Sequence, residues 1–132
     1  GHPLIVVLFD LDEFKHINDT YGHAAGDLVL QEFAAALNRA IRSSDLAVRM
    51  GGDEFLLILP ECTRAQLQFV LDRLVPREVL WGGRKFPIRY SFGWREYAPG
   101  DQPETMLAAA DRALYENKRA SKNPRTSEKV TV

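Results

Sequence analysis

Hydrophobic and polar positions along the chain predict strands and helices in turn. An unbroken apolar run at residues 4–9 is typical of a strand that is buried on both faces. A short helix is then predicted, capped by Asp12 and ended by Gly22. Apolar residues three and four positions apart predict a longer helix over about residues 24–42.

The middle of the chain predicts a β-hairpin, because two strand-like runs flank a pair of glycines. The runs cover about residues 46–50 and 54–59, and Gly51 and Gly52 lie between them. Since the first strand precedes two helices and the hairpin follows them, strands distant in sequence are expected to share one sheet.

The remaining elements follow the same rules. Apolar spacing predicts a helix that begins at Thr63 and ends before Pro76, and alternation predicts a strand. The strand predicted by alternation covers residues 88–97, after a turn at 81–84. A last helix is expected at about 103–121, followed by a loose polar tail at 123–132.

The order of these elements, β-α-α-β-β-α-β-α, predicts an α+β fold. Its centre would be a mainly antiparallel sheet covered by helices. A chain of 132 residues is expected to form a single domain, residues 1–132.

Composition narrows the range of functions. At 45% hydrophobic residues the chain can bury a core, and a net charge of -1 gives no general attraction to nucleic acid or to an anionic membrane. The apolar run at 4–9 is too short to span a bilayer. The only cysteine, Cys62, cannot form an internal disulfide and is expected to behave as a small apolar residue. We therefore expect a cytoplasmic domain that contacts neither nucleic acid nor membrane.

Three carboxylates are candidates for a metal site. Asp53 and Glu54 are adjacent at the tip of the predicted hairpin, and Asp10 ends the first strand. If that strand lies beside the hairpin, Asp10 and the hairpin acids would form an acidic pocket for one or two Mg²⁺ ions. On the hairpin alone, an acidic surface turn is an equally good interpretation.

Other polar residues each have a structural and a functional interpretation. Lys15 lies near a helix start, where a cation gains nothing from the helix dipole, so it is either solvated or faces an anion. Asn18 and Asp27 could read a guanine edge, or could be a turn residue and a first-turn acid.

Two further groups of charged residues remain ambiguous at this level. Lys118 and Lys122 share a face of the last predicted helix, where they could hold phosphates or simply be solvated. Arg42 and Asp45, three residues apart, could bind phosphate and guanine, or could be a helix-end arginine and a turn aspartate.

Together, and in this order, these motifs resemble the GGDEF family of diguanylate cyclases. The matching stretches are residues 9–19, 22–23, 26–27, 49–55, 91–93 and 110–115. The resemblance covers nearly the whole chain and implies the palm-like nucleotidyl-cyclase fold of GGDEF domains.

The resemblance also implies an enzyme activity. Such enzymes condense two GTP molecules into cyclic di-GMP and release two pyrophosphates, with one GTP held by each domain of a homodimer. A non-catalytic module that binds GTP or cyclic di-GMP is the alternative. A general interaction domain with an acidic hairpin is a third, less specific interpretation.

The family's site residues can be carried over one by one. Asp10, Asp53 and the Leu11 carbonyl would bind Mg²⁺, with Mn²⁺ as a substitute, and Asn18 and Asp27 would recognise guanine. Phosphates would be contacted by Lys15, Lys118 and Lys122. Deprotonation of the 3′-hydroxyl would be helped by Asp53 or Glu54. An inhibitory product site would be formed by Arg42, Asp45 and Arg73.

The chain also departs from the family pattern. The helix with a DxLTGLxNR-type motif that normally precedes the first strand is missing from this sequence. Ser121-Lys122-Asn123 stands where the family usually has Gly-Arg-Asn, so the bidentate fork of arginine is lost there. The family's usual architecture implies a sensory or other signalling domain in the same protein, which in some cases is anchored in a membrane.

Overall fold

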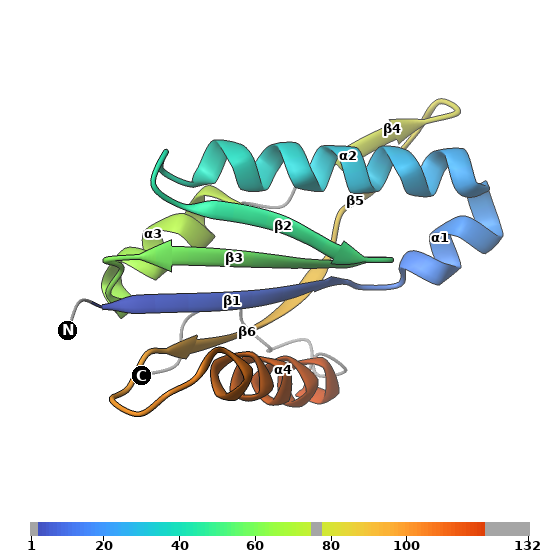
Figure 1. The fold of residues 1–132 in the computed structure, drawn as a ribbon. Coiled ribbons are helices and arrows are strands. Elements are labelled where there is room, and N and C mark those ends of the chain that lie inside the picture. Colours follow the sequence, from blue (N-terminus) through green and yellow to red (C-terminus); the bar gives the residue numbers. More distant parts are fainter. Residues whose placement is uncertain (1–2, 75–77, 121–132) are drawn as a thin grey trace.

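The computed structural model describes residues 3–74 and 78–120 (Figure 1). Its elements, in chain order, are β1 (Leu4–Leu11), α1 (Phe14–Tyr21), α2 (His23–Ala40), β2 (Leu46–Gly51), β3 (Glu54–Pro60), α3 (Arg64–Arg73), β4 (Glu78–Trp81), β5 (Arg84–Pro87), β6 (Tyr90–Glu96) and α4 (Pro103–Ala120). The predicted tail at 123–132, and Lys122 before it, lie outside the described residues.

The central sheet has four strands in the order β2-β3-β1-β6. All three pairings are antiparallel, so the predicted α+β arrangement with a mainly antiparallel sheet is confirmed. β1 lies between β3 and β6, and its register sets Asp10 opposite Glu54 on one side and opposite Ser91 on the other. The acidic end of β1 therefore lies beside the hairpin. This was the condition for Asp10 and the hairpin acids to share one pocket.

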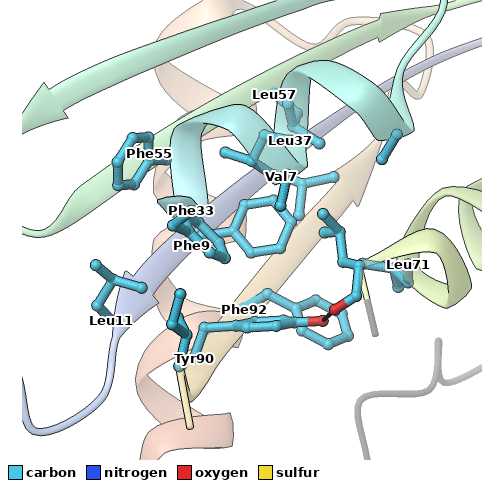
Figure 2. Packing of buried hydrophobic residues seen from close by; sticks show 14 of the residues in the cluster. Val7, Phe9, Leu11, Phe33, Leu37, Phe55, Leu57, Leu71, Tyr90 and Phe92 are labelled. Atoms are coloured by element: carbon cyan, nitrogen blue, oxygen red, sulfur yellow. Dashed lines mark hydrogen bonds between the residues drawn. The ribbon is translucent and has the colours of Figure 1, made fainter. Parts of the chain in front are cut away.

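Alternation along β1 builds two hydrophobic cores, one on each face of the sheet. Phe9 is fully buried on the face covered by α2 and α3, where Phe33 and Tyr90 meet its ring edge-on at 5.7 and 5.5 Å between centroids (Figure 2). Leu8 points to the other face and packs in a smaller cluster with Leu114 of α4. The sheet thus lies between α2 and α4 (Figure 1).

Close contact between α4 and β6 depends on Gly93. A Cβ at this position would lie 2.1 Å from the Leu114 backbone nitrogen and 2.3 Å from the Ala110 carbonyl oxygen. Only a residue without a side chain lets the helix approach the strand so closely. This approach sets the position of everything carried at the C-terminal end of α4.

Two local predictions were incomplete or wrong. The turn at 81–84 is present, but its flanking strands β4 and β5, a separate two-stranded sheet, were not predicted. Asp12 does not cap α1: the N-cap residue is Glu13, at φ 58, and no side chain caps that end. The Asp12 carboxylate instead accepts a 2.8 Å hydrogen bond from the Ser91 hydroxyl. The spacing along the sequence favoured Asp12 as the cap of α1, whereas Ser91 of β6 is the partner that it has in the structure.

Candidate functional site

Asp10 is the centre of the candidate site. It lies on the α4-facing side of β1 and is only 8% exposed. Lys118, from α4, forms an ion pair with its Oδ2 atom. The other oxygen, Oδ1, is buried and has no hydrogen-bond partner within the described part of the chain. A buried carboxylate oxygen without a partner is costly, so this atom indicates a missing positive or donor group.

Asp53 brings a second carboxylate to the same place. Burial, followed by the hydrogen bond and the negative charge of Asp10, raises the pKa of Asp53. The backbone is joined there too, because the Leu11 amide donates to the Asp53 carbonyl at 3.1 Å. The three predicted metal ligands, Asp10, Leu11 and Asp53, therefore meet at one end of the sheet.

Two further charged residues, Lys118 and Asp12, lie around the Asp10–Asp53 pair. Burial acts to lower the pKa of Lys118, but the hydrogen bond and charge of Asp10, with the charges of Asp12 and Asp53, outweigh it and raise that pKa overall. Burial also raises the pKa of Asp12, against the opposing effects of the Ser91 hydrogen bond and of Lys118. One lysine thus faces a group of carboxylates, which leaves a local excess of negative charge.

The donor set at this end fits a hard divalent cation. Asp10 and Asp53 offer carboxylate oxygens, one of them buried and unpartnered. Within residues 3–74 and 78–120 there is no group of three or more His, Cys, Asp or Glu side chains arranged to hold a metal. One or two carboxylates are a common protein contribution to a Mg²⁺ site in which substrate phosphates complete the coordination. Glu54, in contrast, is exposed.

The predicted guanine-recognition residues lie on the neighbouring helices α1 and α2. Asn18 on α1 lies against Gly26 near the start of α2, so closely that a Cβ on Gly26 would lie 1.9 Å from the Asn18 amide oxygen. Asp27, the next residue of α2, is exposed to solvent. Lys15 is exposed in the first turn of α1. The absence of a side chain at position 26 therefore lets the Asn18 amide pack against the residue that precedes Asp27.

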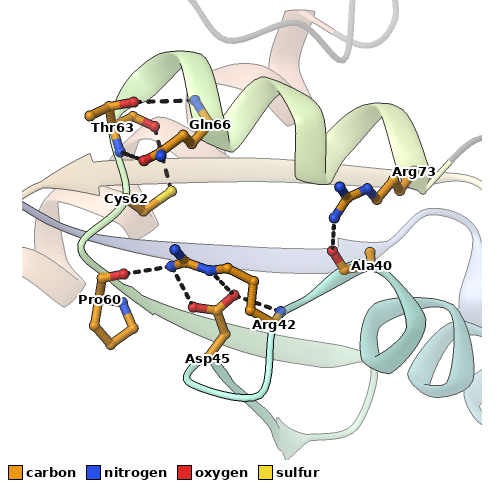
Figure 3. Close-up of polar contacts among 8 residues, drawn as sticks. All are labelled: Ala40, Arg42, Asp45, Pro60, Cys62, Thr63, Gln66 and Arg73. Atoms are coloured by element: carbon orange, nitrogen blue, oxygen red, sulfur yellow. Dashed lines mark hydrogen bonds and ion pairs between the residues drawn. The ribbon is translucent and has the colours of Figure 1, made fainter.

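A second constellation lies at the opposite end of β3 (Figure 3). The Arg42 guanidinium donates from Nε and Nη2 to the two carboxylate oxygens of Asp45, at 3.1 and 2.9 Å. Its Nη2 also donates to the Pro60 carbonyl at 2.6 Å. Arg73 donates to the Ala40 carbonyl at 3.1 Å. Arg42, Asp45 and Arg73 thus lie around one region, and their role as an inhibitory product site stays a prediction.

These residues line a cavity of about 160 Å³. The wall consists of Arg42, Asp45, Cys62, Gln66, Phe69, Val70 and Arg73. Cys62 is buried, and burial raises the pKa of its thiol, which agrees with its predicted apolar role. The cavity combines two arginines with the exposed aromatic ring of Phe69, a suitable lining for an anionic, aromatic ligand.

Two contributors to the acidic site were missed by sequence reasoning. Ser91 holds Asp12 from 79 residues away, and no local signal points to that pair. Arg49 binds the Gly52 carbonyl in the hairpin turn, at 3.0 Å from Nε and 2.6 Å from Nη2. Its position three residues before Gly52 was a usable signal, since an arginine beside a glycine turn can reach an exposed carbonyl.

Comparison with known proteins decides the family. The family model described as "Diguanylate cyclase, GGDEF domain" matches residues 1–124. The chain belongs to the GGDEF-domain family. The predicted resemblance is confirmed, and so is the palm-like cyclase fold expected of a GGDEF domain.

Two curated relatives of this GGDEF domain are a diguanylate cyclase and a response regulator. Diguanylate cyclase A of Treponema denticola is 35% identical over 125 residues, which are 91% of this chain and 34% of that protein. Response regulator PleD of Caulobacter vibrioides is 38% identical over 130 residues, 93% of this chain and 29% of that protein. The chain therefore spans about a third of the length of these relatives.

Solved structures agree with the fold. The GGDEF domain of DgcB from Caulobacter crescentus, in complex with c-di-GMP, superposes with a TM-score of 0.85 at 31% identity, covering 91% of this chain and 74% of that one. Diguanylate cyclase SiaD from Pseudomonas aeruginosa, in complex with its activator SiaC, gives 0.83 at 35% identity, covering 91% and 48%. Among the described helices of this GGDEF domain, none is both long and apolar enough to cross a membrane.

Proposed function

We propose that this GGDEF domain is a diguanylate cyclase, which condenses two GTP molecules into cyclic di-GMP and releases two pyrophosphates. The observation that carries the proposal is the Asp10–Asp53 pair, with one buried carboxylate oxygen unpartnered and Lys118 alongside. The relatives named above as diguanylate cyclases support it.

Asp10, Asp53 and the Leu11 carbonyl would hold Mg²⁺, or Mn²⁺ in its place. The cation, when bound, neutralises charge that develops on the phosphates. Lys118 would contact the same phosphates from α4, since its ammonium already lies at the carboxylate pair. Lys15 and Lys122 are proposed as further phosphate contacts.

Asn18 and Asp27 would select guanine. The amide of Asn18 offers both a donor and an acceptor, and the Asp27 carboxylate can accept from the N–H edge of the base. The packing of Asn18 against Gly26, the residue before Asp27, supports a common ligand. Adenine lacks that N–H edge, so the same pair would reject it.

Each of the two condensation steps forms one bond and breaks one. The 3′-oxygen of one GTP bonds to the α-phosphorus of the other, and the bond from that phosphorus to the leaving pyrophosphate breaks. The hydroxyl proton passes to Asp53 or Glu54. Because each domain holds one GTP, we propose a face-to-face homodimer as the active form.

We further propose that cyclic di-GMP inhibits the enzyme at the Arg42, Asp45 and Arg73 cavity. The two arginines and the Phe69 ring supply contacts for phosphate and base. The domain would act in the cytoplasm, in one protein with a sensory or other signalling domain.

Incubating the chain with GTP and Mg²⁺, followed by chromatographic separation of nucleotides, tests the proposal. Cyclic di-GMP is the expected product, and Asp53→Ala should abolish it. Asp72→Ala, which removes an exposed acid from α3, is the matched control and should leave product formation unchanged. If the wild-type chain makes no product at high protein concentration yet binds cyclic di-GMP tightly, the domain is a binding module rather than a cyclase.

A further inference from the structure

The turn that carries Asp53 is irregular. Arg49 pairs with Phe55 and Gly51 with Glu54, so Met50 is an additional residue that forms a bulge in β2. Gly51 and Gly52 both adopt positive φ, at 137° and 53°. Because glycine has a wide choice of backbone conformations, the local sequence alone does not hold this turn in one shape.

Arg49 provides a contact that can hold it. The guanidinium is exposed, yet both its Nε and Nη2 atoms donate to the same acceptor, the Gly52 carbonyl, at 3.0 and 2.6 Å. Two donors of one rigid, planar group that converge on a single carbonyl oxygen restrain its position more than one donor would. The contact bridges the turn from the strand before it.

The peptide group after Asp53 is held from the other side. The Leu11 amide of β1 donates to the Asp53 carbonyl at 3.1 Å. The Gly52 carbonyl, before Asp53, is held by Arg49, and the Asp53 carbonyl, after it, by Leu11. With both flanking peptide groups restrained, the direction of the Asp53 side chain toward Asp10 is restrained too.

We propose that Arg49 is a positioning residue for the acidic pair: it fixes the Gly52–Asp53 peptide group and so holds the Asp53 carboxylate beside Asp10 for a divalent cation. This inference rests on the proposed function for the identity of the cation. Arg49 acts through the turn, and it touches neither the cation nor the reacting atoms.

Binding of Mn²⁺ to the nucleotide-free chain, followed by electron paramagnetic resonance, tests the inference apart from catalysis. We expect Arg49→Ala to raise the Kd for Mn²⁺ roughly tenfold, as supporting residues around metal ligands commonly do. Arg49→Lys should raise it less, because an ammonium can make a single bond to the carbonyl but cannot fork.

Arg95→Ala is the matched control. This arginine also makes a two-point contact, with Asp101, but it lies four positions along β6 from Ser91. The control should leave the Kd for Mn²⁺ unchanged. Near-ultraviolet circular dichroism of each variant shows whether the fold is retained, and Arg49→Lys serves if Arg49→Ala does not fold.

Steady-state kinetics separate positioning from direct contact with substrate. We expect the Mg²⁺ concentration for half-maximal activity to rise in Arg49→Ala by a factor similar to that for Mn²⁺ binding, with little change in KM for GTP at saturating Mg²⁺. An increased KM with unchanged Mn²⁺ binding would assign Arg49 to the nucleotide and overturn the inference.

The metal measurement also distinguishes this inference from the proposed function. A wild-type chain that binds Mn²⁺ but forms no cyclic di-GMP contradicts the cyclase, while the effect of Arg49→Ala on Mn²⁺ binding still decides the positioning role. A wild-type chain that binds no Mn²⁺ overturns the inference itself.

Discussion

Asp10 shows how a single charged side chain is accommodated inside the sheet. A buried carboxylate is costly unless it is paired and hydrogen-bonded. Lys118 pairs with one oxygen, and the other has no partner among the described residues. The neighbouring Asp53 is a second acidic group, and burial together with Asp10 raises its pKa. A bound cation would satisfy the unpartnered oxygen and offset the excess negative charge, so the site suits the proposed metal chemistry.

Substitution of Gly26 is expected to weaken guanine recognition without lowering the stability of the fold. In Gly26→Ala, the new Cβ meets the end of the Asn18 side chain, which can swing away. Alanine favours the helix by about 0.5–1 kcal/mol, so the free energy of unfolding should hold or increase. We expect KM for GTP to rise roughly tenfold, the factor for about 1.4 kcal/mol of lost hydrogen bonding. An unchanged KM would remove Asn18 from guanine recognition.

Asp101 makes a pH-dependent contribution to stability. The hydrogen bonds from Arg95, and then from the Ala98 amide, lower the pKa of Asp101. Since the folded pKa lies below the unfolded one, the contribution is complete above the unfolded value of about 3.9 and is lost as pH falls through the folded pKa. Asp101→Asn should therefore lower Tm at pH 7, with the difference from wild type shrinking below about pH 4. Equal Tm values at pH 7 would contradict this.

At the scale of elements, two periodicities meet where α4 crosses the sheet. Residues four apart on the helix form one stripe, and residues two apart on β1 form one face. The helix stripe is Met106, Ala110, Leu114 and Lys118. The strand face is Val6, Leu8 and Asp10, and Asp12 follows just after the strand. Both lists change from apolar to charged at the same end. Packing of the apolar parts therefore delivers the ammonium to the carboxylates.

Substitution of Gly93 tests whether the packing of α4 on the sheet controls the position of Lys118 at the acidic site. In Gly93→Ala, the Cβ meets backbone atoms of α4, which cannot move without shifting the helix. We expect denaturant titration to show a loss of about 1–3 kcal/mol or more, with reduced cyclase activity because Lys118 moves with α4. Gly82→Ala, in the separate β4–β5 hairpin, has open space around it and should cost about 1 kcal/mol for its positive φ while sparing activity. Full activity in Gly93→Ala would refute the coupling.

At the scale of the whole molecule, β3 connects two sites. The acidic pair lies beside its first residue, Glu54, and the arginine cavity lies beside its last, Pro60. Product bound at the cavity would have to share Arg42 with Asp45 and the Pro60 carbonyl. This arrangement makes the end of β3 a suitable place for feedback to act.

Product inhibition can be tested at two of the cavity residues. Arg42→Ala and Arg73→Ala should each weaken inhibition by added cyclic di-GMP by roughly tenfold, since each removes a charged contact of about 1.5 kcal/mol or more. Arg73→Ala guards against loss of folding in Arg42→Ala, because the latter removes the guanidinium that pairs with the nearly buried Asp45 carboxylate. Arg64→Ala, an arginine of α3 bound to Glu96, is the control. Unchanged inhibition in both cavity variants would end the feedback proposal.

The sequence by itself determined the elements and the chemistry available at their ends. Buried-strand and amphipathic-helix patterns predicted β1, α2, α3 and α4, and two glycines predicted the hairpin, because these signals act over a few residues. Motif spacing likewise identified Asp10 and Asp53 as candidates.

Only the tertiary structure decided which of these groups meet. Asp10 pairs with Lys118 across 108 residues, and Asp12 binds Ser91 across 79, so no local pattern contains either contact. The prediction that Asp12 caps α1 was wrong for this reason. The register of the sheet brings the Ser91 hydroxyl within reach of the Asp12 carboxylate, which accepts a hydrogen bond from it instead. Register and close packing at Gly93 are properties of the assembled sheet and helix, and they turn separate charged residues into one site.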